Sequence, residues 1–286
     1  MHRRVRAPTI ILGTTGFCSG VESAVSKVEN LTKAYRNVYT LDAILHNETE
    51  MERLRSLGVK EVRENDSNEI IVLPAHGATE SEINALEKRF KKIVDVTCPF
   101  VLRTENLIRM LKESGYKIVI VGEKHHRETR VLSSIAEDKL LLVASSMEEL
   151  ETFENEVFPK VALLSQSTIS KDLVMKVSEF FLRHSFEFRF FDTICPETVK
   201  RQNEAYDIAK RVDCVIVVGG KNSSNTRRLV EIASSVNKNT YFLEDALELN
   251  FNELAKCSSI GILSGTSTPP YIIKEIIDKL NNLSLP

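Results

Sequence analysis

The sequence has no long hydrophobic run: no apolar stretch approaches the roughly 20 residues needed to span a bilayer. Its basic start, Met1 to Arg6, is followed by an apolar run from Thr9 to Leu12, too short for the core of a signal peptide. The formal net charge is only −2, so no global basic field favours nucleic acid. These absences predict a cytoplasmic protein with neither nucleic acid nor membrane as a partner.

Cysteine is scarce, and its arrangement excludes two common uses. The chain has five cysteines, an odd number, and no Cys-x-x-Cys motif, so neither a disulfide framework nor a thioredoxin-type site is expected. In a reducing compartment these residues are free thiols or metal ligands. Cys214 and Cys257 lie inside or beside apolar runs, and we predict that both are small buried side chains.

The other three cysteines, Cys18, Cys98 and Cys195, occupy the same place in a repeated pattern. Each follows a β-rich run and precedes an amphipathic helix, and the spacings of 80 and 97 residues suit one small α/β unit each. Two further β-rich runs recur in each unit. The nine runs are Thr9–Leu12, Ile93–Val96 and Phe188–Phe191 before the cysteines, then Val38–Leu41, Tyr116–Val121 and Cys214–Val218, then Ile70–Leu73, Val161–Leu164 and Ile260–Leu263.

This repeat predicts an α/β fold of three pseudo-symmetric lobes in a trefoil, with loops converging on a central site. The lobes are expected at residues 16–96, 97–193 and 194–282. The N-terminal segment 1–15 is expected to add a strand to another lobe, which the sequence does not identify.

The three cysteines are expected at helix N-termini. Ser19 to Glu22 forms a capping-box pattern, and prolines directly follow Cys98 and Cys195, where a first helical turn tolerates proline. The partial positive charge there favours the thiolate, the form that binds soft metals. Structural zinc sites close four ligands, usually with a closely spaced pair, and no pair is close here. Three thiolates instead suit a [4Fe–4S] cluster with one open iron, which predicts a reductase or a dehydratase.

Polar residues follow the strands at matching positions and suggest an anion site. His46, His126 and Ser223 each stand 28 residues after a cysteine, while His76 and Ser267 follow the third β-rich run of their units. A glycine-rich turn, 219–225, leads to a helix expected to begin near Thr226. Backbone and side-chain donors at such a turn, together with histidines, suit a phosphate or diphosphate.

Glu128 is the candidate proton donor. It stands two residues after His126, and in an extended loop the two side chains would face the same side. Beside an anion and an anionic cluster its pKa should rise, so that the carboxyl holds a proton near neutral pH. Lys124, Arg127 and Arg130 are expected as charges at the rim of the site, with Arg127 the one that could reach the ligand.

Taken together, these motifs resemble the 4-hydroxy-3-methylbut-2-enyl diphosphate reductase family, IspH or LytB, in order over about residues 10–280. The matching segments are Gly16–Val21, His46-Asn47, Ala75–Gly77, Asp95–Pro99, His126–Glu128, Gln166–Thr168, Cys195, Lys221–Asn225 and Gly265–Ser267.

The resemblance implies a trefoil of three α/β domains around a [4Fe–4S] cluster, and loss of an allylic hydroxyl as water with two electrons and two protons. It implies isopentenyl and dimethylallyl diphosphate as products, in the last step of the non-mevalonate pathway. An external one-electron donor such as ferredoxin or flavodoxin is expected. The implied roles are Cys18, Cys98 and Cys195 as cluster ligands, Glu128 as proton relay, Ser167 or Thr168 at the hydroxyl end, and His46, His76, His126, Ser223, Ser224, Asn225 and Ser267 as diphosphate ligands.

The chain departs from the family pattern at three places. Arg127 stands where the family usually has proline, Ser167 stands where a threonine is common, and Thr14-Thr15 replaces a frequent Pro-Arg. None of the expected cluster or diphosphate ligands is lost.

Two other functions share parts of this pattern. A dehydratase similar to quinolinate synthase would have the same architecture and cluster, but a carboxylate pocket richer in arginine or lysine. A non-enzymatic iron–sulfur sensor would not need Glu128 beside an anion site. The electron donor, the oligomeric state and the product ratio are not encoded in any motif of the sequence.

Overall fold

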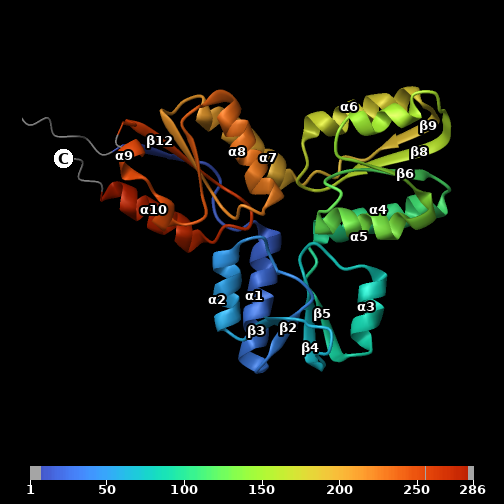
Figure 1. Cartoon of the computed structure of the whole chain (residues 1–286), viewed down its shortest axis with the longest axis horizontal. Helices are drawn as coiled ribbons and strands as arrows, with labels where there is room; N and C mark the ends of the chain where they lie inside the picture. Colours follow the sequence, from blue (N-terminus) through green and yellow to red (C-terminus); the bar gives the residue numbers. More distant parts are fainter. Residues whose placement is uncertain (1–7, 255, 283–286) are drawn as a thin grey trace, which may run out of the picture. The chain divides into compact units, whose positions relative to one another are not determined.

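The computed structural model describes residues 8–254 and 256–282 (Figure 1). The described chain has an α/β fold with three four-stranded sheets, in which every strand pair is parallel. These residues divide into two compact units: residues 8–22, 45–57, 196–254 and 256–282 form the first, and Ser23–Ile44 and Gly58–Cys195 form the second. The helix α1 (Ser19–Ala34) crosses the boundary between them along the chain.

The first unit contains one sheet, with strand order β1-β12-β10-β11. Its strands are β1 (Thr9–Leu12), β10 (Cys214–Val218), β11 (Thr240–Leu243) and β12 (Ser259–Ser264). Its helices are α2 (Glu48–Ser56), α7 (Pro196–Ala209), α8 (Ser224–Val236), α9 (Phe251–Leu254) and α10 (Pro270–Asn281), with a 3-10 turn at Ala246–Glu248.

Helices cover both faces of this sheet, which is why its central strands are continuously apolar. Ile216 and Ile262 face a core that α10 completes with Ile273 and Ile276. The opposite face, which includes Val217, packs against α7 and α8. All five residues of β10 are buried, so this strand anchors the polar turn that follows it.

The second unit contains two sheets, with orders β3-β2-β4-β5 and β7-β6-β8-β9. The first is built from β2 (Val38–Thr40), β3 (Val59–Glu61), β4 (Asn68–Leu73) and β5 (Phe90–Asp95). The second is built from β6 (Lys117–Val121), β7 (Leu140–Ala144), β8 (Phe158–Ser165) and β9 (Ser185–Phe190). The helices of this unit include α3 (Glu80–Glu87), α4 (Pro99–Glu113), α5 (Arg127–Ala136) and α6 (Lys171–Arg183), and 3-10 turns lie at Glu137–Lys139 and Glu148–Phe153.

The threefold repeat is confirmed at the level of the sheets. All nine predicted β-rich runs overlap observed strands. Written from β3, β7 and β11, the three sheets read β3-β2-β4-β5, β7-β6-β8-β9 and β11-β10-β12-β1, so equivalent strands occupy equivalent places. Those three strands lie at one edge of their sheets and were missed by the sequence analysis. β3 is short with two exposed charged residues, whereas β7 and β11 are apolar enough to have been recognised.

β1 completes the sheet that contains the C-terminal strand. It pairs in parallel with β12, and the register joins Thr9 to Ser259 and Leu12 to Ile262. The predicted N-terminal strand segment began at residue 1, and residues 1–7 lie outside the described part of the chain. The lobe boundaries at 16–96, 97–193 and 194–282 stay a prediction.

Two helix starts differ from the sequence prediction. α1 begins at Ser19 itself, because the carbonyl of Cys18 already accepts the amide of Glu22, which makes Cys18 rather than Ser19 the capping residue. α8 begins at Ser224, two residues before the expected start, because the Ser223 side chain accepts the amide hydrogen of Thr226.

Cys214 and Cys257 are buried as expected, but they are joined as a disulfide with their Cα atoms 5.9 Å apart. The predicted separate thiols were wrong here because β10 and β12 are neighbours, with Cys214 paired to Ile260, only three residues beyond Cys257. As for membranes, none of the helices in the described ranges combines the length and apolar character of a spanning segment.

Candidate functional site

The three proposed ligand cysteines have the same backbone environment. The amide of Cys18 donates to the carbonyl of Thr266, that of Cys98 to Ala75, and that of Cys195 to Ser167, at 3.0, 2.8 and 2.9 Å. Each accepting carbonyl lies two residues beyond the end of a strand: β12, β4 or β8. The repeat therefore extends from the sheets to the hydrogen bonds that orient each cysteine.

The side chains of these cysteines suit a metal-bound thiolate. All three are partly buried, none is in a disulfide, and each directly precedes a helix, α1, α4 or α7. Cys98 caps α4 without a side-chain hydrogen bond, so its sulfur is not used for capping. Among residues 8–254 and 256–282, no three or more His, Cys, Asp or Glu side chains form a metal-binding group. Cluster ligation by these cysteines is therefore a proposal that rests on their chemistry and repeated setting.

The first unit contains a polar cradle at the N-terminus of α8. Asn225, in the first turn, is only 2% exposed, and both its Nδ2 and its Oδ1 are buried without a hydrogen-bond partner. Leaving such atoms unsatisfied costs about 1–3 kcal/mol each, which points to a ligand that completes their bonding. Ser223 and Ser224 are buried beside it at the positive end of the helix dipole.

Two loops close on this cradle. The Ser267 hydroxyl donates to the backbone carbonyl of His46 at 3.1 Å, so these two predicted ligands are neighbours. A Cβ on Gly220 would lie 2.4 Å from that same carbonyl oxygen, so only glycine allows the turn after β10 to approach the His46 loop this closely. Within this unit, His46, Ser267 and the start of α8 therefore lie together, as the sequence predicted.

We expect replacement of Asn225 by alanine to weaken diphosphate binding by about 1–3 kcal/mol, because its amide would lose charge-assisted hydrogen bonds to the anion. His46→Ala, His76→Ala and Ser267→Ala should have effects of similar size. The measurement is calorimetric titration with inorganic diphosphate, and the exposed Asn252→Ala is a matched control on the same unit. Unchanged affinity in all four variants would refute the anion site.

In the second unit, Glu128 is bound to Ser167 through both carboxylate oxygens. The Ser167 amide donates to Oε1 at 2.8 Å and its hydroxyl donates to Oε2 at 2.6 Å. The carbonyl of the same serine accepts the amide of Cys195. Ser167 thus joins the candidate proton donor directly to the backbone of a candidate cluster ligand.

The pKa of Glu128 is raised to about 7, chiefly because the side chain is buried. The two hydrogen bonds from Ser167 oppose this rise, and the charge of Glu105 adds to it. Burial likewise raises the pKa of Glu105. The direction of the predicted shift is confirmed, and burial accounts for it in the protein alone.

The prediction that His126 and Glu128 face the same side of an extended loop was wrong. The two residues do not lie in an extended loop: His126 is the N-cap of α5, and Glu128 lies in its first turn. The His126 Nδ1 accepts the amide hydrogen of Glu128 at 3.2 Å, so the pair is neighbouring through capping. His76 is buried in the turn after β4, where Gly77 has a φ of +86°.

Gln166 holds the loop that carries Ser167 and Thr168, a role that the sequence analysis missed. Its Nε2 donates to the Thr168 hydroxyl at 2.7 Å. Its Oε1 accepts the hydroxyl of Thr129 on α5 and the amide of Glu123. Gln166 is fully buried, and the sequence indicated only a polar residue between two serines after an apolar run, without its partners.

Arg201 is a second missed residue, in the first unit. It is 2% exposed, and its guanidinium donates to the carbonyls of Gly16, Ser264 and Gly265, at 2.9–3.1 Å. It thereby links the loop before Cys18 to the loop before Ser267. Its position on α7, six residues after Cys195, gave no sequence signal, because an arginine on an amphipathic helix is normally exposed.

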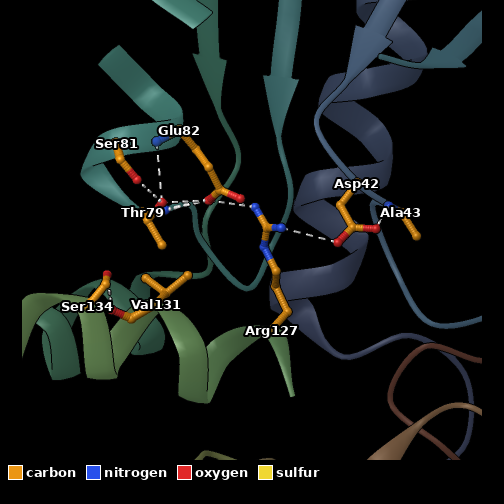
Figure 2. Close-up of polar contacts among 8 residues, drawn as sticks. All are labelled: Asp42, Ala43, Thr79, Ser81, Glu82, Arg127, Val131 and Ser134. Atoms are coloured by element: carbon orange, nitrogen blue, oxygen red, sulfur yellow. Dashed lines mark hydrogen bonds and ion pairs between the residues drawn. The ribbon is translucent and has the colours of Figure 1, made fainter. Parts of the chain in front are cut away.

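Arg127 does not lie at an exposed rim but forms two ion pairs within the second unit (Figure 2). Its side chain is 10% exposed, with Nη2 2.9 Å from Glu82 Oε2 and Nη1 3.4 Å from Asp42 Oδ2. Glu82 also forms the capping box of α3 with Thr79, three residues after His76. Arg127 therefore ties the first turn of α5 to the start of α3 and to the loop after β2.

Replacing Arg127 by proline should leave the fold and turnover nearly unchanged. Arg127 is the first residue of α5, where proline is favoured, and His126 already has the extended geometry that a following proline requires, with φ −66° and ψ 137°. Arg127→Ala, which removes the ion pairs without adding rigidity, should cost about 1 kcal/mol of unfolding free energy.

Thermal melts and turnover of both variants test this difference, with the exposed Arg130→Ala on the same helix as the control. A proline variant that melts below the alanine variant would show that the ion pairs, and not the rigidity of this turn, matter most.

The sequence comparisons match nearly the whole chain. A family model described as LytB protein matches residues 10–281. A 4-hydroxy-3-methylbut-2-enyl diphosphate reductase of Campylobacter hominis is 36% identical over 274 residues, covering 94% of this chain and 96% of that relative. The reductase of the same description from Caldanaerobacter subterraneus is 36% identical over 281 residues, covering 96% of both.

Solved structures agree with the fold. A structure described as (E)-4-hydroxy-3-methyl-but-2-enyl diphosphate reductase, the terminal enzyme of the non-mevalonate pathway, has a TM-score of 0.72 and 32% identity, covering 96% of this chain and all of that one. A related diphosphate reductase from Plasmodium falciparum has a TM-score of 0.87 at 23% identity, covering 97% and 89%. On the family match and these identities over almost its full length, the chain belongs to the LytB family.

Proposed function

We propose that this protein is the cytoplasmic 4-hydroxy-3-methylbut-2-enyl diphosphate reductase of its organism. It reduces the allylic alcohol to isopentenyl and dimethylallyl diphosphate. The C–O bond to the hydroxyl breaks, two electrons enter from an external one-electron donor of the ferredoxin or flavodoxin class, and two protons complete the hydrocarbon and the released water. Family membership supports this reaction, since relatives over the whole chain length bear that name.

A [4Fe–4S] cluster held by Cys18, Cys98 and Cys195 would supply single electrons and a Lewis-acidic iron. The observation that carries the proposal is the shared setting of these cysteines: each amide donates to a carbonyl two residues beyond a strand. Three thiolates in equivalent local settings are a ligand set that suits one iron–sulfur cluster.

The remaining steps fall to side chains of the chain itself. The buried amide of Asn225, with Ser223, Ser224, Ser267 and the histidines His46, His76 and His126, binds the diphosphate. Glu128 holds a proton near neutral pH because burial raises its pKa, and Ser167 or Thr168 lies with it at the hydroxyl end of the substrate. The Ser167 hydroxyl, bonded to Glu128, offers a route for that proton toward the leaving oxygen.

The decisive experiment is an anaerobic assay with the hydroxymethylbutenyl diphosphate and a chemical one-electron donor such as reduced methyl viologen. We expect oxidation of the viologen to depend on the substrate, with both diphosphate products detected. Iron-loaded protein that binds inorganic diphosphate but forms neither product would refute the proposed reaction.

A further inference from the structure

The strand β9 exposes an unusual run of aromatic side chains at the edge of its sheet. In the order β7-β6-β8-β9 it is the last strand, and it reads Ser-Phe-Glu-Phe-Arg-Phe. The alternating residues Phe186, Phe188 and Phe190 share one face. Phe186 is 87% exposed and Phe190 39%, and Leu182 at the end of α6 is 63% exposed. Large apolar side chains exposed on one strand in this way suit an interaction site.

The backbone of β9 leaves one side available for pairing. Phe191 donates its amide hydrogen to the carbonyl of Leu163 on β8, and the register continues back from Phe190 to Phe188 and Glu187. Because backbone groups alternate in direction along a strand, Phe188 and Phe190 direct their N–H and C=O groups away from β8. An edge strand with such groups accepts a further strand.

The charges on the other face of β9 are arranged symmetrically about Phe188. Glu187 and Arg189 flank it, half-exposed, with 3.4 Å between their charged atoms. If a second β9 lay antiparallel with the twofold axis at Phe188, Glu187 would oppose Arg189 of the partner subunit, and the reverse. Phe186 would oppose Phe190 of the partner subunit, and the two Phe188 residues would face each other.

We propose that two copies of this chain associate through β9, whose strands pair antiparallel about Phe188 and join two sheets edge to edge. The order Phe-Glu-Phe-Arg-Phe places opposite charges at equal distances from Phe188, which makes this edge complementary to itself in both charge and apolar surface. Charged side chains often keep an edge strand from pairing, and like charges would repel in a self-complex, whereas here each charge meets its opposite.

Neighbouring side chains of the same unit hold the two charged residues in place. The Tyr116 hydroxyl donates to Glu187, and Lys160 lies 3.6 Å from the Glu187 carboxylate. The Arg189 guanidinium lies over the Tyr116 ring, 4.9 Å from its centre. Both side chains are therefore held on one face of the strand before a partner arrives, which lowers the entropy lost on association.

A charge-swap experiment on the full chain tests this pairing, using sedimentation velocity and light scattering. Wild-type protein is expected to be a dimer whose dissociation increases on dilution. Arg189→Glu, which places like charges opposite each other twice, should raise the dissociation constant about tenfold or more, and Glu187→Arg should do the same. Mixing these two variants should restore a heterodimer, since both opposite-charge pairs re-form only in the mixed complex.

The control is Arg183→Glu, a charge reversal on exposed α6 that should leave the dimer intact. Circular dichroism and thermal melts establish that each variant is folded before its mass is measured. A monomeric wild type, a dimer unaffected by either single swap, or a mixture that fails to form heterodimers would each overturn the proposal. The outcome is independent of the proposed reductase activity, because no step of it depends on substrate or on iron.

Discussion

Glu128→Gln is expected to lower turnover by about 10²–10⁴ while leaving substrate binding nearly intact, because proton transfer from a positioned group is worth that much in rate. Glutamine keeps the size of the side chain: its Oε1 can accept the Ser167 amide hydrogen and its Nε2 can donate to the Ser167 hydroxyl, in place of the bonds that hold Glu128 at 2.8 and 2.6 Å. Glu128→Asp, with its shorter reach, should lie between glutamine and wild type. Single-turnover kinetics separate the chemical step from binding.

The pH dependence of the same residue gives a second signature. With a pKa of about 7, Glu128 is protonated below neutral pH and able to donate, so turnover should fall as the pH rises above 7. The contribution of Glu128 to the free energy of unfolding also decreases as the pH rises. Because its pKa in the folded protein lies above the ordinary value of 4.5, this contribution is fully present below pH 4.5 and is lost as the pH rises through 7.

Glu128→Gln should therefore remove both the fall in turnover above pH 7 and this part of the pH-dependent stability. Glu113, exposed at the C-terminal end of α4 in the same unit, offers a matched control as Glu113→Gln. Near-normal turnover in Glu128→Gln would show that the proton comes from water or from the substrate's own diphosphate.

Replacement of any one of Cys18, Cys98 and Cys195 by serine is expected to abolish the cluster. Anaerobically reconstituted wild-type protein should contain about four irons and show the broad visible absorption of thiolate-to-iron charge transfer. Each of the three variants should lose most of that absorption, since serine is a hard ligand that iron–sulfur clusters rarely accept.

The control for this prediction is the buried pair Cys214 and Cys257. These residues join β10 to the segment before β12, and their replacement by serine should leave iron content and absorption unchanged. Equal loss of absorption in all five variants would contradict the assignment of ligands. Loss confined to Cys214→Ser and Cys257→Ser would contradict it more directly.

The fold was largely predictable because its information is local and repeated. Each β-rich run before a cysteine overlaps an observed strand. A single β-rich run is weak evidence for a strand, but the same pattern occurring three times supports each of the three assignments. β3 was hidden for a physical reason: Val59 alone is buried in it, and its other two residues face solvent. An edge strand of three residues buries too few side chains to require the alternation of apolar and polar residues by which strands are recognised in a sequence.

The polar contacts within the candidate site were predictable only in part. The residue types and their register after each strand indicated an anion site, but Arg127 was expected at the rim, because nothing local indicates that Glu82 and Asp42 lie within reach of it. Gln166 and Arg201 were missed for the same reason. Their bonds join segments tens to hundreds of residues apart, and such contacts depend on packing that no short motif encodes.

The pairing of β1 with β12 has a consequence for the order in which the protein is made. The first strand leaves the ribosome some 250 residues before its partner, since Thr9 pairs with Ser259. The amide of Cys18 likewise cannot form its hydrogen bond until Thr266, whose carbonyl accepts it, has been made. Chains fold from the N-terminus as they emerge, so Cys98 and Cys195 can find their backbone partners Ala75 and Ser167 during synthesis. Cys18 cannot, so the three proposed ligands all have their backbone partners only after residue 266 has been made.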